Sequence, residues 1–238
     1  MADTPQTASA IQAEPRVVAS VAAATSQRSD AIPTIEGSRS YEVFKRSLDL
    51  ALGAVGLVIT GLLSIGIIPL IQRRSPGPPV FAQTRVGKGG KTFTCYKFRT
   101  MNPDADLLKN EVAHLNEVQG PVFKIANDPR GVPELKWLRK YSLDELPQFW
   151  NVLRGDMSLV GPRPPVPDEV EDYTPEQLGR LAVKPGLTCT WQVNGRSNVS
   201  FDDWVAMDLD YISRRSTALD LELFVRTIPA MVSGRGAS

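Results

Sequence analysis

The sequence predicts an α+β protein in which one N-terminal membrane helix precedes a small mixed domain of helices and a β-hairpin. No charged residue occurs from Leu50 to Ile71, and as a helix this run covers roughly 30 Å, the thickness of a bilayer's hydrocarbon core. Two segments of strand-like composition then flank a glycine-rich turn. Helical periodicity returns near the C-terminus.

Composition divides the chain further. Residues 1–40 are rich in Ala, Ser, Thr, Pro and Gln, which predicts a disordered tail, and no signal peptide is recognisable there. Residues 41–74 form the predicted membrane-inserted helix, and residues 75–238 form the remaining domain.

A formal net charge of +1 over 238 residues argues against nucleic-acid binding driven by bulk charge. Two cysteines, Cys95 and Cys189, show no metal or disulfide pattern, which fits a cytoplasmic setting.

Basic residues flank the apolar run on both sides. Lys45 and Arg46 precede it, and Arg73 and Arg74 follow it. A helix that simply spans a membrane shows a basic bias on one side only. The flanks therefore predict a re-entrant helix that enters and leaves by the cytoplasmic face.

The position of the bend in this helix stays open. Pro69, the strongest helix breaker, lies close to the C-terminal end, and the middle offers only Gly61 and Gly66. A straight span therefore remains an alternative.

The domain begins with a predicted hairpin. Val80 to Thr84 and Thr92 to Phe98 form its strands, and Cys95 is expected to pack in the interior. Asp104 to Asn116 is predicted to be an amphipathic helix with its leucines on one side. Helices are also predicted over Phe201–Arg215 and Leu219–Val232. Their aromatic and apolar side chains face either the core or the headgroup layer of a membrane, two alternatives that the pattern does not separate.

The most informative stretch runs from Arg139 to Pro164 and reads RKYSLDELPQFWNVLRGDMSLVGPRP. Ser142 to Glu145 has the Ser-x-x-Glu spacing of a capping box. Pro147 offers a second register, as the first residue of the helix. In either register Asp144 and Glu145 lie at the positive end of a short helix, which favours their ionised forms. Gly155 is expected to end that helix.

Taken alone, the two carboxylates read as helix-capping side chains. Their surroundings favour a catalytic role instead. The two carboxylates could hold a metal or act as a nucleophile, and the arginines on either side are suited to binding phosphate. That combination is typical of phosphoryl transfer. Asp156, later in the same stretch, is open to either a metal or a turn-capping role.

These motifs resemble those of the bacterial polyprenyl-phosphate sugar-1-phosphate transferases. The resemblance rests on the DELPQFWNVLRGDMSLVGPRP stretch, on KFRTM at Lys97–Met101, and on the KPGLT and WQVNGR segments, and it extends from about Tyr41 to the C-terminus. It implies a monotopic enzyme with a re-entrant helix and interfacial helices. Such an enzyme resides in the bacterial inner membrane, with its catalytic domain facing the cytoplasm.

The resemblance also implies the reaction. Hexose-1-phosphate, with galactose or glucose as the expected sugar, passes from a UDP-sugar to undecaprenyl phosphate, and UMP is released as the first step of exopolysaccharide synthesis. Asp144 is then the nucleophile, Glu145 helps to hold Mg²⁺ together with Asp144, and five basic side chains contact phosphate: Lys97, Arg99, Arg139, Arg163 and Arg196. Membrane lipid is a further partner, and a homo-oligomer is left open.

Two hypotheses of other classes compete with this one. The first is a non-catalytic membrane adaptor of a polysaccharide assembly complex. The second is a basic hairpin protein that binds nucleic acid or anionic lipid, which the near-neutral net charge disfavours. Release of UMP from a UDP-sugar separates the enzyme from the adaptor.

Overall fold

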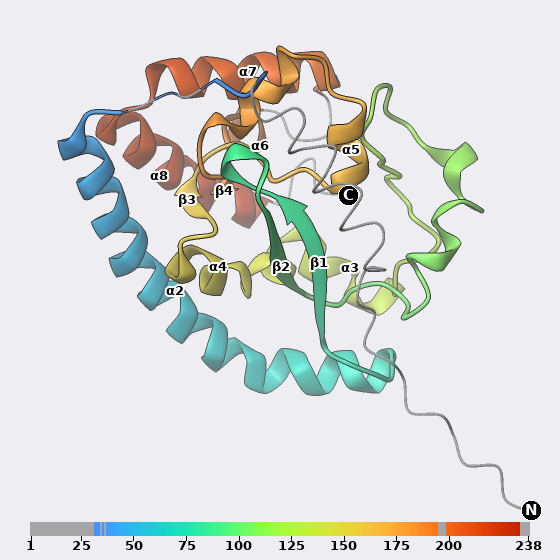
Figure 1. Cartoon of the computed structure of the whole chain (residues 1–238). Coiled ribbons are helices and arrows are strands. Elements are labelled where there is room, and N and C mark those ends of the chain that lie inside the picture. Colours follow the sequence, from blue (N-terminus) through green and yellow to red (C-terminus); the bar gives the residue numbers. More distant parts are fainter. Residues whose placement is uncertain (1–30, 34, 36, 195–198, 234–238) are drawn as a thin grey trace, which may run out of the picture.

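The computed structural model describes residues 31–33, 35, 37–194 and 199–233, and it confirms the predicted α+β class (Figure 1). One long helix, α2, curves along the outside of a mixed domain of short helices and two small sheets. The helices of the domain are α3 (Lys136–Lys140), α4 (Gln148–Arg154), α5 (Pro167–Glu171), α6 (Thr190–Asn194), α7 (Phe201–Arg214) and α8 (Thr217–Ser233). The strands are β1 (Val80–Val86), β2 (Thr92–Phe98), β3 (Ser158–Val160) and β4 (Gly186–Thr188).

Helix α2 (Arg39–Arg74) is long and apolar enough to cross a membrane, and no other helix among the described residues meets that description. It begins where the Ser38 side chain accepts a hydrogen bond from the Tyr41 amide, and it continues through Pro69 without a break. The helix is curved along its length (Figure 1). Near its middle, the hydroxyls of Thr60 and Ser64 each bond the carbonyl four residues earlier, an arrangement that often bends helices.

The concave side of α2 packs on the domain along its whole length. Gly53 and Gly56 allow close contact with α4, and a Cβ at Gly56 would lie 2.4 Å from the ring of Phe149. Further along, Ile67 and Ile71 join a buried cluster with residues on both sides of Asp144 and Glu145, the pair of carboxylates called the dyad below. The convex side carries exposed apolar side chains, which include Val55, Val58, Leu62 and Ile65.

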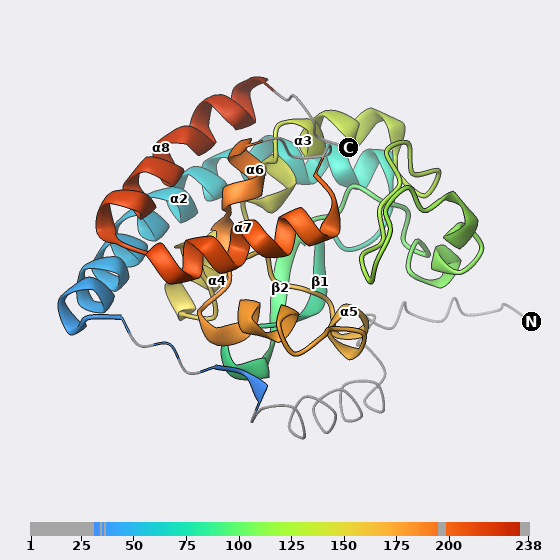
Figure 2. The ribbon, with the colours of Figure 1, turned by 90° about the horizontal axis from the view of Figure 1, so that it is seen from above.

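Polar contacts fasten the N-terminal part of α2 to the same domain. Lys45 bonds Asp220 of α8 at 2.8 Å and the Val160 carbonyl at 2.9 Å, and Arg46 bonds carbonyls at the end of α4. Figures 1 and 2 both show α8 running beside this part of α2. The N-terminal basic flank of the apolar run is therefore engaged in contacts within the protein.

The hairpin forms nearly as predicted, with β1 two residues longer. β1 and β2 pair antiparallel, and Phe81, Gln83 and Arg85 stand opposite Lys97, Cys95 and Phe93. Directly paired residues point to the same face of a sheet, so these six side chains share one face. Cys95 is buried in the core, as predicted, while Lys97 emerges beyond the core.

The predicted helix from Asp104 to Asn116 is wrong. This segment forms two short 3₁₀ turns, Leu107–Lys109 and Ala113–Leu115, and Leu107 is 76% exposed. Leu107 and Leu115 are both exposed, so little apolar burial is available to stabilise an amphipathic helix here.

The two C-terminal helices are confirmed within two residues at each end. Tyr211 of α7 packs in the core, whereas Ile228 of α8 is 56% exposed.

Candidate active site

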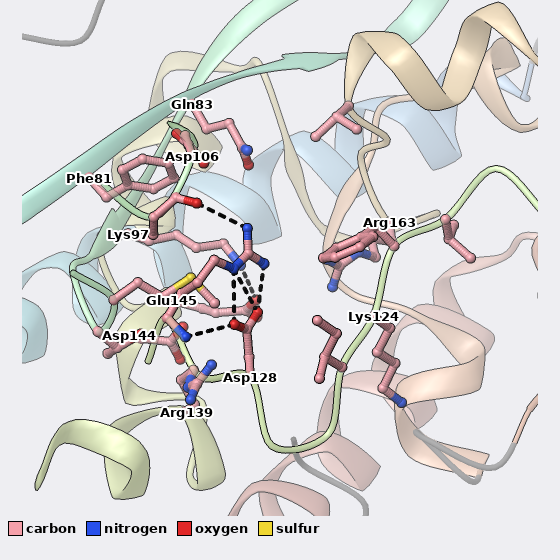
Figure 3. Close-up of a pocket in the computed structure, with 18 of the residues that line it drawn as sticks. Phe81, Gln83, Lys97, Asp106, Lys124, Asp128, Arg139, Asp144, Glu145 and Arg163 are labelled. Carbon is pink, nitrogen blue, oxygen red and sulfur yellow. Dashed lines mark hydrogen bonds and ion pairs between the residues drawn. The ribbon is translucent and has the colours of Figure 1, made fainter. Parts of the chain in front are cut away.

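A cavity of about 430 Å³ opens beside the hairpin and gathers most of the predicted site residues (Figure 3). Its walls come from one face of β1 and β2, from the segment that follows β2, from the turn before α4, and from α6 and α7. Eight basic and five acidic side chains line it. An excess of cationic side chains in a cavity of this size suits an anionic ligand such as a nucleotide.

Asp144 and Glu145 lie in a 3₁₀ turn, Leu143–Glu145, just before α4. The capping box is wrong: Ser142 has a left-handed backbone (φ 55°), and its carbonyl, not its hydroxyl, accepts the Glu145 amide. Pro147 immediately precedes the first residue of α4, close to the second predicted register, and Gly155 ends the helix at φ 88°. Ser142 is the one non-glycine residue at positive φ among those described, and strain of this kind tends to gather at functional sites.

Strand β2 and α4 are fastened together, and this brings Lys97 to the dyad. The fully buried Asn151 of α4 donates to the Thr94 carbonyl at 2.6 Å and accepts from the Tyr96 amide at 3.2 Å. Lys97 follows on the same strand, and its Nζ lies 2.7 Å from Glu145 Oε1. The ammonium of Lys97 therefore neutralises Glu145 and leaves Asp144 without an ion-pair partner among the described residues.

The two carboxyls have opposite pKa shifts. Burial raises the pKa of Asp144 to about 7, with Glu145 adding to the rise and Lys97 and Arg139 opposing it. Burial also acts on Glu145, but the charges of Lys97 and Arg163 outweigh it and hold its pKa below the usual range. The expectation that a helix N-terminus ionises both groups is therefore wrong for Asp144, because desolvation dominates.

The predicted phosphate-binding side chains behave differently from one another. Arg139 and Arg163 line the cavity with no ion pair to a described carboxylate, and Arg163 lies over the ring of Trp204 at 5.9 Å. Figure 3 shows Arg139 beside Asp144 and Arg163 on the opposite wall. Arg99 also lines the cavity, but its guanidinium donates to the Ser75 carbonyl at the end of α2. Arg196 lies outside the described residues.

Sequence reasoning missed several side chains of the same cavity. Asp128 and Arg130 form an ion pair at 2.6 Å on its wall, and hydrogen bonds from Arg130 hold the pKa of Asp128 low. Arg85 enters from β1, and Trp191 and Trp204 stack edge to face at 4.1 Å. For Arg85 a signal existed, because alternation along β1 puts it on the face that carries Lys97.

The dyad offers few ligands for a metal. Within the part of the chain that the structure describes, no group of three or more His, Cys, Asp or Glu side chains gathers in a way that could hold an ion. Two adjacent carboxylates nevertheless fit Mg²⁺, which commonly takes one or two protein carboxylates and completes its shell with substrate phosphates and water. Asp156 takes no part in the cavity, since it pairs with Arg154 at 3.3 Å and with Asn151.

Residues 40–234 match the protein family described as bacterial sugar transferase. The chain belongs to this family. The transferase is 44% identical over 199 residues to the galactosyl transferase CpsE of Streptococcus agalactiae, with 83% of this chain and 44% of that protein covered. It is 40% identical over 197 residues to the exopolysaccharide production protein ExoY of Rhizobium meliloti, with 81% and 87% covered.

A third relative is the undecaprenyl-phosphate galactose phosphotransferase of Salmonella typhimurium, 39% identical over 204 residues, with 84% of this chain and 42% of that protein covered. The transferase thus spans less than half the length of two of these relatives and most of the third. The family predicted from the motifs, and the transferase class of enzyme with it, are confirmed.

Proposed function

We propose that the transferase moves hexose-1-phosphate from a UDP-sugar to undecaprenyl phosphate and releases UMP, as the first step of exopolysaccharide synthesis. The observation that carries the proposal is the dyad itself. A buried carboxyl at Asp144 lies in a cation-lined cavity between Arg139 and Arg163, next to a helix suited to a membrane. The names of the relatives favour galactose as the sugar.

The first step is a displacement at the sugar-bearing phosphorus. A carboxylate oxygen of Asp144 bonds to this phosphorus, the bond to the oxygen that bridges the two phosphates breaks, and UMP leaves with that oxygen. In the second step an oxygen of undecaprenyl phosphate attacks the same phosphorus, and the carboxylate of Asp144 is regenerated. Division of one transfer into two displacements is covalent catalysis.

The surrounding cations serve both steps. Arg139 and Arg163 are free of carboxylate partners in the described structure, so they are available to offset the charge of the diphosphate. Lys97 keeps Glu145 ionised at neutral pH. We assign Mg²⁺ to the oxygens of Asp144 and Glu145, where it would supply further charge neutralisation to the phosphates.

The sugar is best identified with a panel of donors. Purified full-length transferase would be offered UDP-galactose, UDP-glucose and their N-acetyl derivatives with undecaprenyl phosphate, and UMP would be measured. We expect UDP-galactose to give the highest rate. A non-catalytic adaptor would release no UMP from any donor, and that result would reject the proposed function.

We also propose that α2 is re-entrant in the bacterial inner membrane, with the domain on the cytoplasmic face. Both ends of α2 are tied to one domain, through Lys45 at one end and Ile71 at the other, while its convex side is apolar and exposed. Trp137 and Trp150 flank the dyad segment and are 41% and 47% exposed, as side chains in a headgroup layer often are.

Cysteine labelling tests this topology. Single cysteines at Ser40, in the first turn of α2, and at Pro78, just after its end, occupy exposed positions. Both should be protected from an impermeant thiol reagent in intact cells and labelled after the inner membrane is opened. A cysteine at Leu62 on the convex side is the matched control and should stay unlabelled throughout, because lipid shields it. Labelling of only one of the two flanking positions in intact cells would establish a spanning helix instead.

A further inference from the structure

Arg85 is a buried cation whose guanidinium is only partly satisfied by the described residues. It is 7% exposed, and two of its nitrogens have acceptors: the Pro164 carbonyl at 2.8 Å and Gln83 Oε1 at 2.6 Å. Its Nε has no hydrogen-bond partner among the described residues, and it makes no ion pair with a described carboxylate. A guanidinium has five N–H donors, so a substantial part of its bonding capacity is unused.

Arg180, another of the buried arginines, shows what a structural role looks like. Arg180 is 3% exposed, and it donates to Asp208 through both Nε and Nη2 at 2.8 Å and to the Tyr173 hydroxyl at 2.6 Å. A buried charge is destabilising unless it is paired and hydrogen-bonded. Arg180 meets this condition within the protein, whereas Arg85 does not.

Arg85 also lies where an anion can reach it. It lines the main cavity and a small adjoining recess of about 20 Å³, which has room for a single oxygen-sized group. The polar side chains of this recess are Arg85, Lys97, Glu145, Gln148, Arg163 and Gln192. Three cations and one carboxylate give the recess a positive charge.

The recess is rigidly built around Arg163. Arg85 and the adjacent Val86 amide both bond the turn that contains Arg163, at the carbonyls of Pro164 and Pro165. On the other side, the Gly161 amide bonds the Thr188 carbonyl of β4. Arg85 therefore fixes the Arg163 turn and stands beside it, and burial together with the Arg163 charge lowers the pKa of Arg85.

We propose that Arg85 and Arg163 form the subsite for the α-phosphate of the donor, the phosphate that leaves with UMP. The assignment rests on the proposed function. In a displacement at phosphorus the leaving oxygen lies opposite the attacking one. The recess is lined by Glu145 and not by Asp144, so it lies on the side of the dyad away from the proposed nucleophile, and Arg139 on the Asp144 side is left for the transferred phosphoryl group.

The test compares UMP with uridine, which differ only in the α-phosphate. Affinity of each for the detergent-solubilised full-length transferase would be measured by calorimetry for wild type, Arg85→Gln and Arg85→Lys. We expect Arg85→Gln to weaken the binding of UMP roughly 10-fold or more, in line with the loss of a charged hydrogen bond. The affinity for uridine should stay within about 2-fold of that of wild type. Lys88→Gln removes a charge from the exposed turn of the same hairpin and should change neither affinity.

Arg85→Lys keeps the charge but loses the fork geometry, so it should weaken UMP selectively but less than Arg85→Gln does. If a thermal melt shows that Arg85→Gln does not fold, the comparison of Arg85→Lys with wild type provides the test. Equal losses for UMP and uridine would mean that Arg85 supports the nucleotide site as a whole and not the phosphate, and unchanged affinity for UMP would mean that it contacts no phosphate. Either result overturns the subsite while wild type still releases UMP; a wild type that releases none rejects the proposed function and the subsite together.

Discussion

Replacement of Asp144 by asparagine is expected to lower UMP release by at least about 1,000-fold and, at the same time, to make the folded protein more stable. Activity falls because an amide of nearly the same shape cannot form the bond to phosphorus. Stability rises because Asp144 is buried and its pKa is raised to about 7. Above that pH the native protein must hold a buried negative charge, which the asparagine variant does not have.

The direction of the pKa shift of Asp144 determines how the stability difference between wild type and variant depends on pH. A carboxyl whose pKa is raised on folding favours the native state at pH values below its ordinary pKa, and this advantage is lost as the pH rises through the native pKa. The variant should therefore melt like wild type at pH 4 and several degrees higher at pH 8, for a gain of roughly 2 kcal/mol. Asp156→Asn, in the same motif but outside the cavity, should keep activity within about 3-fold of wild type. An Asp144→Asn enzyme that keeps its activity would show that Asp144 is not the nucleophile.

Loss of Lys97 is expected to have the second largest effect. Lys97→Met removes the ammonium that lies 2.7 Å from Glu145 and that holds the pKa values of both carboxyls down. Activity at pH 7 should fall by about 100-fold, since Asp144 is then mostly protonated and one phosphate contact is lost. In wild type, kcat/KM should rise with pH through about 7, because this parameter reports the pKa of the free enzyme.

The pH profile separates this role from simple loss of structure. In Lys97→Met the midpoint should move to higher pH, while Lys97→Arg should keep it close to that of wild type. Lys91→Met, at an exposed position of the same hairpin, should leave both rate and midpoint unchanged. A Lys97→Met enzyme of low activity with an unmoved midpoint would show that Lys97 does not tune Asp144.

Local patterns predicted those parts of the fold that local forces determine. The hairpin was predictable because alternation in β2 and the glycines at its turn act over a few residues, and the same holds for Gly155 at the end of α4. The helix predicted from Asp104 to Asn116 failed because its pattern requires a packing partner that only the tertiary structure could supply. The capping box failed because Ser142 adopts a left-handed backbone, a conformation that the Ser-x-x-Glu spacing does not reveal.

The residues of the candidate site could be predicted from motifs, but the ion pairs and pKa shifts among them could not. Lys97, Arg139, Arg163 and the dyad were recognised from their sequence context, and the fold brings them to one cavity. The sequence does not show which arginines form ion pairs. Asp208 pairs with Arg180 across 28 positions, while Arg85 makes no ion pair with any carboxylate that the structure describes. The raised pKa of Asp144 was likewise hidden, since it depends on burial.

The most direct test of the covalent mechanism is the amount of UMP that wild-type transferase releases from its UDP-sugar in the absence of any lipid acceptor. We expect a burst of about one equivalent of UMP per enzyme, after which release stops because the phosphosugar remains on Asp144. Undecaprenyl phosphate added later should discharge the protein and restart turnover. No UMP before the lipid is added, together with no labelled protein from a radioactive sugar donor, would show instead that the transfer is direct.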